Sequence, residues 1–285
     1  MKDLQGTSGS AWQDAAGRKW VRLQARTDAQ LAPFGHAAQA ALEVTAGERV
    51  LDVGCGAGQT LLELSERVVS NGQVVGVDVS EPLLARARER VDQSGLGNVE
   101  LLIGDAAEQR FERPFDAVFS RFGVMFFDES AEAFRNLHAA LRPGGRLGFV
   151  CWQSLHQNPW AQRLLDAVQV VAPGQPVPDL LALDRPGPFY FAKAEFVEEL
   201  LSGAGFEDVC MRSLEIDLWF GGARTLDEAV EYALDIGPAA RFVTDGDPER
   251  LPEFTRALRE AIEPFLSERG VWFPSATWIV TARRA

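Results

Sequence analysis

A glycine-rich turn follows directly on a short apolar run in the segment Val50-Leu51-Asp52-Val53-Gly54-Cys55-Gly56-Ala57-Gly58. Glycine is needed where the backbone takes a positive φ or where a ligand approaches the main chain closely. The dinucleotide-binding pattern G-x-G-x-x-G also requires a third glycine, and Gln59 occupies that position. The carboxylate of Asp52 suits a cationic or amino-bearing ligand better than a pyrophosphate. The turn therefore predicts a small-molecule site that differs from a dinucleotide site.

Two further carboxylates stand at the ends of apolar runs downstream of this turn. Asp78 ends the run Val74–Asp78. From a strand tip beside a glycine turn, its carboxylate can accept both hydroxyl hydrogens of a ribose. Asp105, in Gly104-Asp105-Ala106, could accept a hydrogen bond from an adenine amino group while a backbone N–H serves a ring nitrogen. The structural alternatives are a strand-end or helix-cap role for Asp78 and a plain turn for Asp105.

The elements that must position these groups lie between Arg49 and Trp152. Short apolar runs alternate there with amphipathic stretches, which is typical of a parallel sheet with helical crossovers. The expected strands are Arg49–Val53, Val74–Asp78, Asn98–Ile103, Phe115–Ser120 and Arg146–Trp152. We expect one helix to begin at Ser80 and another at Asp128, with Leu141 on the apolar face of the second.

Three regions are expected along the chain, namely an N-terminal helical cap at 1–48, the core at 49–152 and a region at 153–285 that completes the sheet. The last region contains two long strand-like runs, Phe206–Phe220 and Val271–Ala282, around an insertion of about 221–270 with two helices. We expect this insertion and the N-terminal helix to form a lid over a substrate.

Five segments follow one another in order along the core: Leu51–Gly58, Gly76–Ser80, Gly104–Ala106, Phe115–Ser120 and Leu141–Leu147. Together they resemble the class I S-adenosylmethionine-dependent methyltransferases of the small-molecule type. The resemblance covers a little over a third of the chain. It implies an α/β, Rossmann-like seven-stranded sheet that is mostly parallel, with an antiparallel last strand. It also implies that S-adenosylmethionine, whose product is S-adenosylhomocysteine, lies across the carboxyl ends of the strands.

The resemblance assigns parts of the cofactor to matching residues. Three glycines would line the methionine moiety, Asp78 would bind the ribose, and Asp105 with Ala106 would hold the adenine. Asp52 would lie near the amino group, and Arg121 near the methionine side. The full implied cofactor set is Asp52, Gly54, Cys55, Gly56, Gly58, Gln59, Asp78, Val79, Asp105, Ala106, Ser120 and Arg121.

The segment after the fourth strand narrows the range of methyl acceptors. Phe122-Gly123-Val124-Met125 is similar to the corresponding loop of quinone-biosynthesis C-methyltransferases, which usually carry Arg where this chain has Met125. This departure argues against a quinone-type acceptor. Methyltransferases of nucleobase or amide nitrogen often place an N-P-P-Y-like motif here, and this chain has Ser120-Arg121-Phe122-Gly123 instead.

Methyl transfer from a sulfonium needs mainly alignment and exclusion of water, and a base helps only a poorly ionised acceptor. His156 follows the fifth strand, so it is a candidate general base or acceptor ligand, or else a loop residue. Arg121 is the second catalytic candidate, either binding a carboxylate or pairing with an acidic neighbour. Cys55 invites a nucleophile interpretation, but a small residue among glycines explains it better.

Bulk properties limit the partners. The chain carries 28 Lys and Arg against 41 Asp and Glu, a formal net charge of -13, which disfavours nucleic acid. Its three cysteines are far apart, and no metal-ligand spacing is visible. Residues 1–10 lack the apolar stretch of a signal peptide, and no run approaches a membrane span. We therefore expect a cytoplasmic monomer or homodimer without a metal, whose partner is a small-molecule acceptor.

These observations predict a methyltransferase acting on oxygen or carbon of a small, apolar or aromatic metabolite. Two alternatives remain open. One is a catalytically silent accessory protein that binds the S-adenosyl ligand, which would share the same cofactor motifs. The other is an NAD(P)-dependent oxidoreductase, against which Gln59 and the order of the five segments count.

Overall fold

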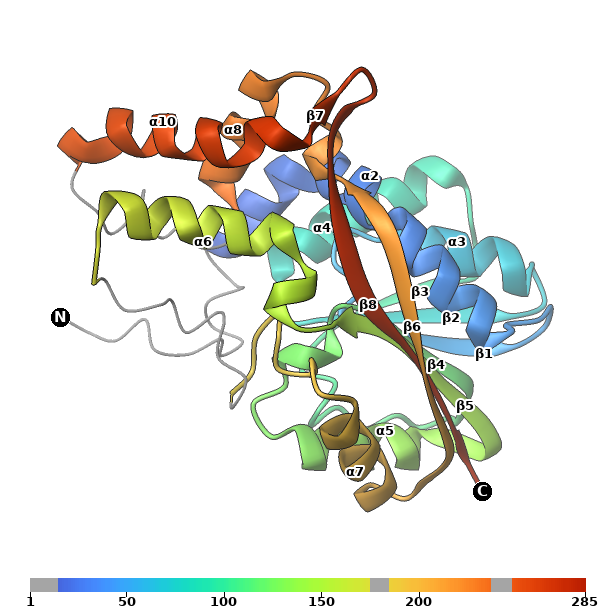
Figure 1. The fold of residues 1–285 in the computed structure, drawn as a ribbon. Helices are drawn as coiled ribbons and strands as arrows, with labels where there is room; N and C mark the ends of the chain where they lie inside the picture. Colours follow the sequence, from blue (N-terminus) through green and yellow to red (C-terminus); the bar gives the residue numbers. More distant parts are fainter. Residues whose placement is uncertain (1–14, 175–184, 237–247) are drawn as a thin grey trace, which may run out of the picture.

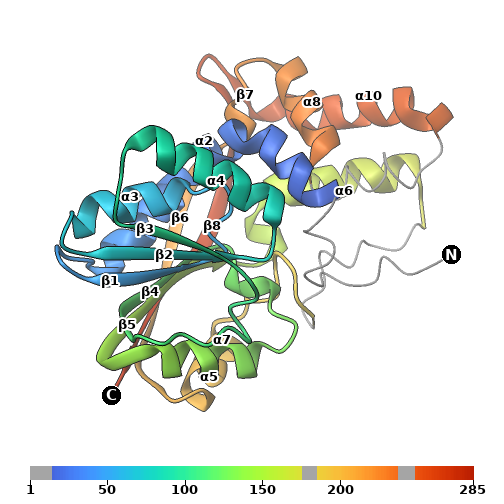
Figure 2. The ribbon, with the colours of Figure 1, turned by 180° about the vertical axis from the view of Figure 1, so that it is seen from behind.

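The computed structural model describes residues 15–174, 185–236 and 248–285. Within these ranges a twisted sheet has helices on both faces (Figures 1 and 2). The strands are β1 (Arg49–Val53), β2 (Gln73–Asp78), β3 (Val99–Ile103), β4 (Phe115–Arg121), β5 (Leu141–Trp152), β6 (Phe206–Trp219), β7 (Leu266–Ser267) and β8 (Gly270–Arg284). The α-helices are α2 (Ala15–Leu42), α3 (Gln59–Val68), α4 (Glu81–Ser94), α5 (Ser130–Ala140), α6 (Pro159–Val171), α7 (Ala194–Gly203), α8 (Leu226–Asp235) and α10 (Leu251–Ile262). Short 3-10 helices are η1 (Val124–Phe126), η2 (Leu155–Gln157), η4 (Phe220–Gly222), η5 (Pro248–Arg250) and η6 (Glu263–Phe265).

The strand order is β3-β2-β1-β4-β5-β8-β6, and the short β7 pairs with β8 outside this path. The strands from β3 to β5 are parallel, whereas β8 runs antiparallel to both β5 and β6. The predicted seven-stranded sheet with an antiparallel last strand is confirmed, and β7 is an addition. From β1 the chain moves to β2 on one side and later returns to β4 on the other. Ligands of α/β sheets bind at the carboxyl ends of strands at such a reversal.

The central strands are buried along almost their whole length, because helices cover both faces of the sheet. In β1, four of the five residues in RVLDV are buried, and β2 has a similar pattern. Helices α2, α3 and α4 lie on one face, and α5 and α7 lie on the other (Figures 1 and 2). Nearly unbroken apolar runs are the pattern that such two-sided cover requires.

The expected helix from Asp128 and strand from Arg146 have different boundaries in the structure. Helix α5 ends at Ala140, and β5 already begins at Leu141. Leu141, expected on the helix face, is extended (φ -77°, ψ 150°) and pairs with Phe115 of β4. Pro143 explains the early end, because it disfavours a helical conformation of the preceding residue and lacks an N–H.

The predicted long C-terminal strands are β6 and β8, which pair over most of their length. Helices α8 and α10 lie in the expected insertion, and α10 packs against both α8 and α6 beyond the carboxyl ends of the parallel strands (Figure 1). Residues 237–247 of the insertion and 1–14 of the expected N-terminal cap lie outside the described residues. None of the described helices is both long and apolar enough to cross a membrane.

Candidate cofactor site

The turn after β1 holds three glycines in the left-handed conformation. Gly54, Gly56 and Gly58 have φ values of 68°, 54° and 84°. This region costs a residue with a Cβ roughly 1–2 kcal/mol. At Gly58, the N-cap of α3, a Cβ would lie 3.0 Å from the Cβ of Ala87, whereas at Gly56 it would meet no atom within 4 Å. The glycines are therefore needed for the backbone, and the middle of the turn leaves space beside the main chain.

A second turn, after β4, packs directly against the first. A Cβ on Gly123 would lie 2.8 Å from the Val53 carbonyl oxygen and 3.2 Å from Gly54 Cα, so the two backbones touch. The buried Ser120 hydroxyl donates to the Val53 carbonyl (2.8 Å) and accepts from the N–H of Gly123 (3.2 Å). Ser120 thus has a bridging role, and Gly123 belongs to the site although it is missing from the predicted set. Its position two residues after the end of a strand was the available signal.

Asp78, at the end of β2, reaches into the glycine turn. Its Oδ2 accepts from the N–H of Gly56, and its Oδ1 accepts from the N–H of Ser80, both at 2.8 Å. Burial raises the pKa of Asp78, while these backbone N–H groups lower it. The N–H of Val79 acts on this carboxylate in the same way. An ionised carboxylate offers about four lone-pair positions, so with three backbone donors one position is left for a ribose hydroxyl. The strand-end role and the predicted ribose role of Asp78 are therefore compatible. Val79, the next residue, is half-buried.

Asp52 is fully buried on β1, two residues before the first glycine of the turn. Thr60 of α3 donates its hydroxyl hydrogen to Oδ2, whereas Oδ1 has no hydrogen-bond partner among the described residues. Burial raises the pKa of Asp52 to about 7, against the lowering effects of the Thr60 hydroxyl and the Arg121 charge. A buried carboxylate oxygen is costly unless it is hydrogen-bonded or paired. This oxygen could accept a hydrogen bond from an ammonium group.

The structure argues against Cys55 as a nucleophile. The residue is 3% exposed, and its Sγ would lie 2.9 Å from a Cβ on Gly76 of β2. Burial raises the pKa of this thiol well above its ordinary value. The thiolate is the reactive form, so Cys55 fills the space above Gly76 as a small apolar side chain, and only its backbone belongs to the turn.

The turn after β3 carries Asp105 and Ala106. Asp105 is exposed, and its Oδ1 accepts from the N–H of Ala107 at 2.8 Å, as in an Asx turn. Ala106 is buried, and its carbonyl accepts from the side-chain amide of Asn136 on α5 at 2.8 Å. Gly104 donates to the Asp78 carbonyl at 3.0 Å. This bond ties the expected adenine turn to the strand end that carries the expected ribose ligand.

Arg121 joins the end of β4 to the start of α3. Its Nη1 donates to Oε1 of Gln59, and its Nη2 lies 3.5 Å from Oδ1 of Asp28 on α2. Of the two interpretations, the structure therefore contains the pairing with an acidic neighbour. Asp28 and Arg90, which also contacts this turn, were not in the predicted set. Both lie on helices whose apolar periodicity gives no signal for a polar contact made across the fold.

The histidines occupy three separate places. His36 lies 3.2 Å from Glu63, and His138 packs against the Phe206 ring at 5.0 Å between centroids. His156 is exposed in η2, after β5. No hydrogen bond or ion pair joins it to any residue in the described ranges. The structure thus brings the cofactor set together but does not join His156 to it.

Aromatic side chains gather at the carboxyl ends of β4 and β5. Phe122 has a φ of 58°, unusual for a residue with a Cβ, and its ring stacks on Trp152 at 4.4 Å and 19°. Phe34 of α2 meets both rings edge-on, at 5.8 Å and 5.3 Å, and Trp160 lies 5.0 Å from Trp152. This aromatic cluster of Phe34, Phe122, Trp152 and Trp160 adjoins the Gly54–Gly123 contact through Phe122. Strained backbone that tertiary packing enforces is common at functional sites.

The residues present fit the parts of S-adenosylmethionine. The open glycine turn can receive a ligand close to its backbone, and Asp78 keeps an acceptor position for a ribose hydroxyl. The unpartnered Oδ1 of Asp52 suits an ammonium. Among the described residues, no group of three His, Cys, Asp or Glu side chains could hold a metal ion.

Comparisons with known proteins agree with this geometry. Residues 50–145 match the family described as "Methyltransferase domain". The chain is 32% identical over 223 residues to nocamycin O-methyltransferase of Saccharothrix syringae, covering 70% of this chain and 78% of that protein. It is 34% identical over 122 residues to demethylmenaquinone methyltransferase of Listeria welshimeri, covering 42% of this chain and 52% of that protein.

In fold, the chain is similar to the crystal structure of the YcgJ protein from Bacillus subtilis. The TM-score is 0.56 at 17% identity, with 90% of this chain and 97% of that chain covered. This likeness concerns the fold, whereas the match to nocamycin O-methyltransferase extends over most of both sequences. The chain therefore belongs to the class I S-adenosylmethionine-dependent methyltransferases.

Proposed function

We propose that this enzyme methylates an oxygen or a carbon of a small, apolar or aromatic metabolite. The aromatic cluster beside the Gly54–Gly123 contact is the observation that carries the proposal. Its four rings are at most 8% exposed and pack on one another, so the cluster forms an apolar wall next to the turn that is expected to hold the methionine end of the cofactor. Aromatic rings pack well against such walls in stacked and edge-on arrangements. The nocamycin and demethylmenaquinone enzymes are also named for small-molecule acceptors.

The cofactor residues have separate tasks in this proposal. Asp78 holds the ribose hydroxyls, Asp105 and Ala106 hold the adenine, and Asp52 faces the amino group. When bound, S-adenosylmethionine supplies a methyl group already activated by the positive sulfonium. The chain's own residues therefore need to align the acceptor with that methyl group and exclude water.

Two polar residues complete the proposed catalytic region. Arg121 holds Gln59 at the start of α3 and so keeps the end of β4 against the glycine turn. His156 stands just beyond β5, the strand that contributes Trp152 to the cluster. For a hydroxyl acceptor we assign His156 the role of general base, because a neutral imidazole can take a proton near neutral pH.

Helices α6, α8 and α10, together with α2, form the proposed lid over the acceptor. Helix α10 packs against both α6 and α8, and α2 packs against η4. The excess of acidic residues supports a small-molecule rather than a nucleic acid partner, and a cytoplasmic monomer or homodimer stays our expectation.

The decisive experiment supplies S-adenosylmethionine with a deuterated methyl group to a panel of phenols, enolic ketones, carboxylic acids and amines. We expect label in an oxygen- or carbon-linked methyl group of an aromatic or apolar acceptor, with S-adenosylhomocysteine as the second product. The Asp78→Ala variant serves as the control and should transfer little label at limiting cofactor. Label confined to amines would contradict the proposed acceptor class.

A further inference from the structure

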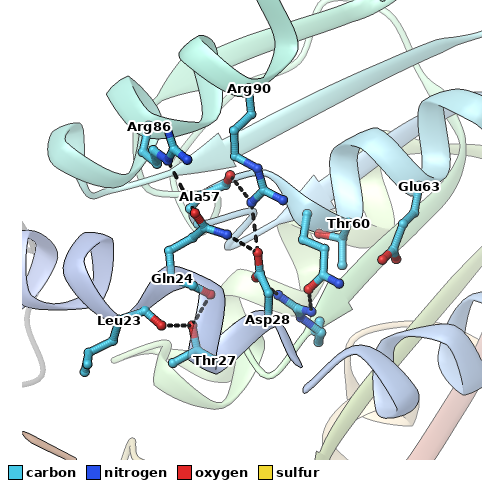
Figure 3. Close-up of polar contacts among 12 residues, drawn as sticks. Leu23, Gln24, Thr27, Asp28, Ala57, Thr60, Glu63, Arg86 and Arg90 are labelled. Atoms are coloured by element: carbon cyan, nitrogen blue, oxygen red, sulfur yellow. Dashed lines mark hydrogen bonds and ion pairs between the residues drawn. The ribbon is translucent and has the colours of Figure 1, made fainter. Parts of the chain in front are cut away.

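Asp28 of helix α2 lies between two arginines from other elements. Its Oδ2 accepts from Nη1 of Arg90 on α4 at 3.0 Å (Figure 3). Its Oδ1 lies 3.5 Å from Nη2 of Arg121 at the end of β4. Gln24, one helical turn before Asp28, donates to the same Oδ2 (Figure 3). A single carboxylate thus faces two guanidinium groups, one from helix α4 and one from the end of strand β4.

Both arginines also hold the glycine turn. The Nη1 of Arg90 donates to the carbonyl of Ala57 at 2.9 Å (Figure 3), and the Nη1 of Arg121 donates to the side chain of Gln59. Ala57 and Gln59 stand on either side of Gly58, where the turn becomes α3. The arginines therefore fix both neighbours of Gly58, and Asp28 fixes the arginines.

These charges are shielded from solvent. The side chains of Asp28, Arg90 and Arg121 are 15%, 18% and 14% exposed. Partly buried charges are screened little by salt, and removing one partner of such a group leaves an unpaired charge. Without the carboxylate, two guanidinium groups would face each other without a counter-charge. Repulsion between them would push the Arg90 side chain away from the Ala57 carbonyl.

The opposite side of α2 is held just as firmly. Arg26 donates to the carbonyls of Gly221 (2.8 Å) and Glu228 (2.7 Å), and the Gln30 side chain accepts from the N–H of Gly221 (2.8 Å). Arg26 lies two residues from Asp28, which places their side chains about 200° apart around the helix. Helix α2 is thus anchored on η4 and α8, and it presents Asp28 from a fixed position.

We propose that Asp28 is a positioning residue for the cofactor. Through Arg90 and Arg121 it holds Ala57 and Gln59, and thereby keeps the glycine turn in its binding conformation. The proposal concerns cofactor affinity alone. A chain that binds S-adenosylhomocysteine but methylates none of the expected acceptors would refute the acceptor class and leave this role of Asp28 intact.

The test compares Asp28→Asn with Asp166→Asn by calorimetric titration of S-adenosylhomocysteine. Asp166 on α6 is a close match, because it also accepts from a glutamine four residues earlier, Gln162, and pairs with Arg163. We expect Asp28→Asn to weaken binding by about tenfold, as for loss of a charge-assisted hydrogen bond. Asp166→Asn should bind as the wild type does. Equal affinity of Asp28→Asn and wild type would overturn the proposal.

A double-mutant cycle separates positioning from a general loss of structure. Arg90→Met removes the contacts to both Ala57 and Asp28, so it should weaken binding by itself, by about fivefold or more. In that background Asp28→Asn should cost at most about threefold, because its main partner is already gone. A tenfold cost in both backgrounds would overturn the proposal. Were Asp28→Asn to fail to fold, as judged by circular dichroism, wild-type affinity of Arg90→Met would overturn it.

Discussion

Gly56 after β1 and Gly221 in η4 have nearly the same positive φ, 54° and 57°, but opposite surroundings. A Cβ on Gly56 would meet no atom within 4 Å, whereas a Cβ on Gly221 would lie 2.3 Å from the ring of Tyr232. The first region keeps space beside its backbone, and the second fills that space with a side chain. Left-handed glycines therefore leave open space beside the backbone in one region and allow close packing in the other.

Gly221→Ala should give the largest loss of stability and tests the close packing of Gly221 against Tyr232. The new methyl group would overlap the Tyr232 ring and keep the left-handed strain, so we expect a loss of about 4 kcal/mol in the free energy of unfolding. The matched control is Gly222→Ala, since Gly222 has a φ of 68° but only a distant neighbour at 4.0 Å. Urea denaturation measures both variants. Equal losses would show that packing does not distinguish them.

Asp52→Asn tests the buried carboxylate of the cofactor region through pH. Burial raises the pKa of Asp52 to about 7 from 3.8, so between these values the folded chain binds a proton that the unfolded chain has released. The free energy of unfolding must therefore fall as pH rises from 5 to 8, by about 2–3 kcal/mol for this group. Asp52→Asn removes this contribution. Urea titrations at both pH values, without cofactor, should show a smaller fall in the variant, and identical falls would contradict the burial argument.

Asp78→Ala tests whether the polar contacts around the glycine turn contribute to cofactor binding. We expect S-adenosylhomocysteine to bind at least about tenfold more weakly, because charge-assisted hydrogen bonds to the ribose are lost. The bond that shapes the turn at Gly56 is lost as well. Calorimetry gives the affinity, and Asp116→Ala, at the distant amino end of β4, serves as the control. Unchanged affinity of Asp78→Ala would show that the ribose lies elsewhere.

Gly56→Ala should give the smallest change in stability and sharpens the comparison most directly. With open space around it, the added methyl group carries only the left-handed strain, about 1 kcal/mol. Gly95→Ala is matched to it, because Gly95 has a φ of 71° and a Cβ added there would also meet no atom within 4 Å. We expect similar stability losses, measured by thermal unfolding. Only Gly56→Ala should also weaken S-adenosylhomocysteine binding, and equal affinity of both variants would argue against a ligand beside Gly56.

The parts of the molecule that could be predicted are those that local sequence signals specify. The strands β1 to β4, the glycine turn and Asp78 all depend on local signals: apolar runs, positive-φ glycines and a carboxylate at a strand end. The long strands β6 and β8 followed from their length and apolar character. The start of β5 was misplaced because Leu141 fits a helical face as well as a strand, and pairing with Phe115 decides between them.

The sequence by itself therefore determined the family, the parallel core and the residues that meet at the ends of neighbouring strands. Only the tertiary structure decided which distant side chains join that site. Asp28 lies 62 residues from Arg90 and 93 from Arg121 along the chain, and yet its carboxylate meets both side chains. Such contacts depend on how whole helices and strands pack, and a local pattern carries no record of that packing.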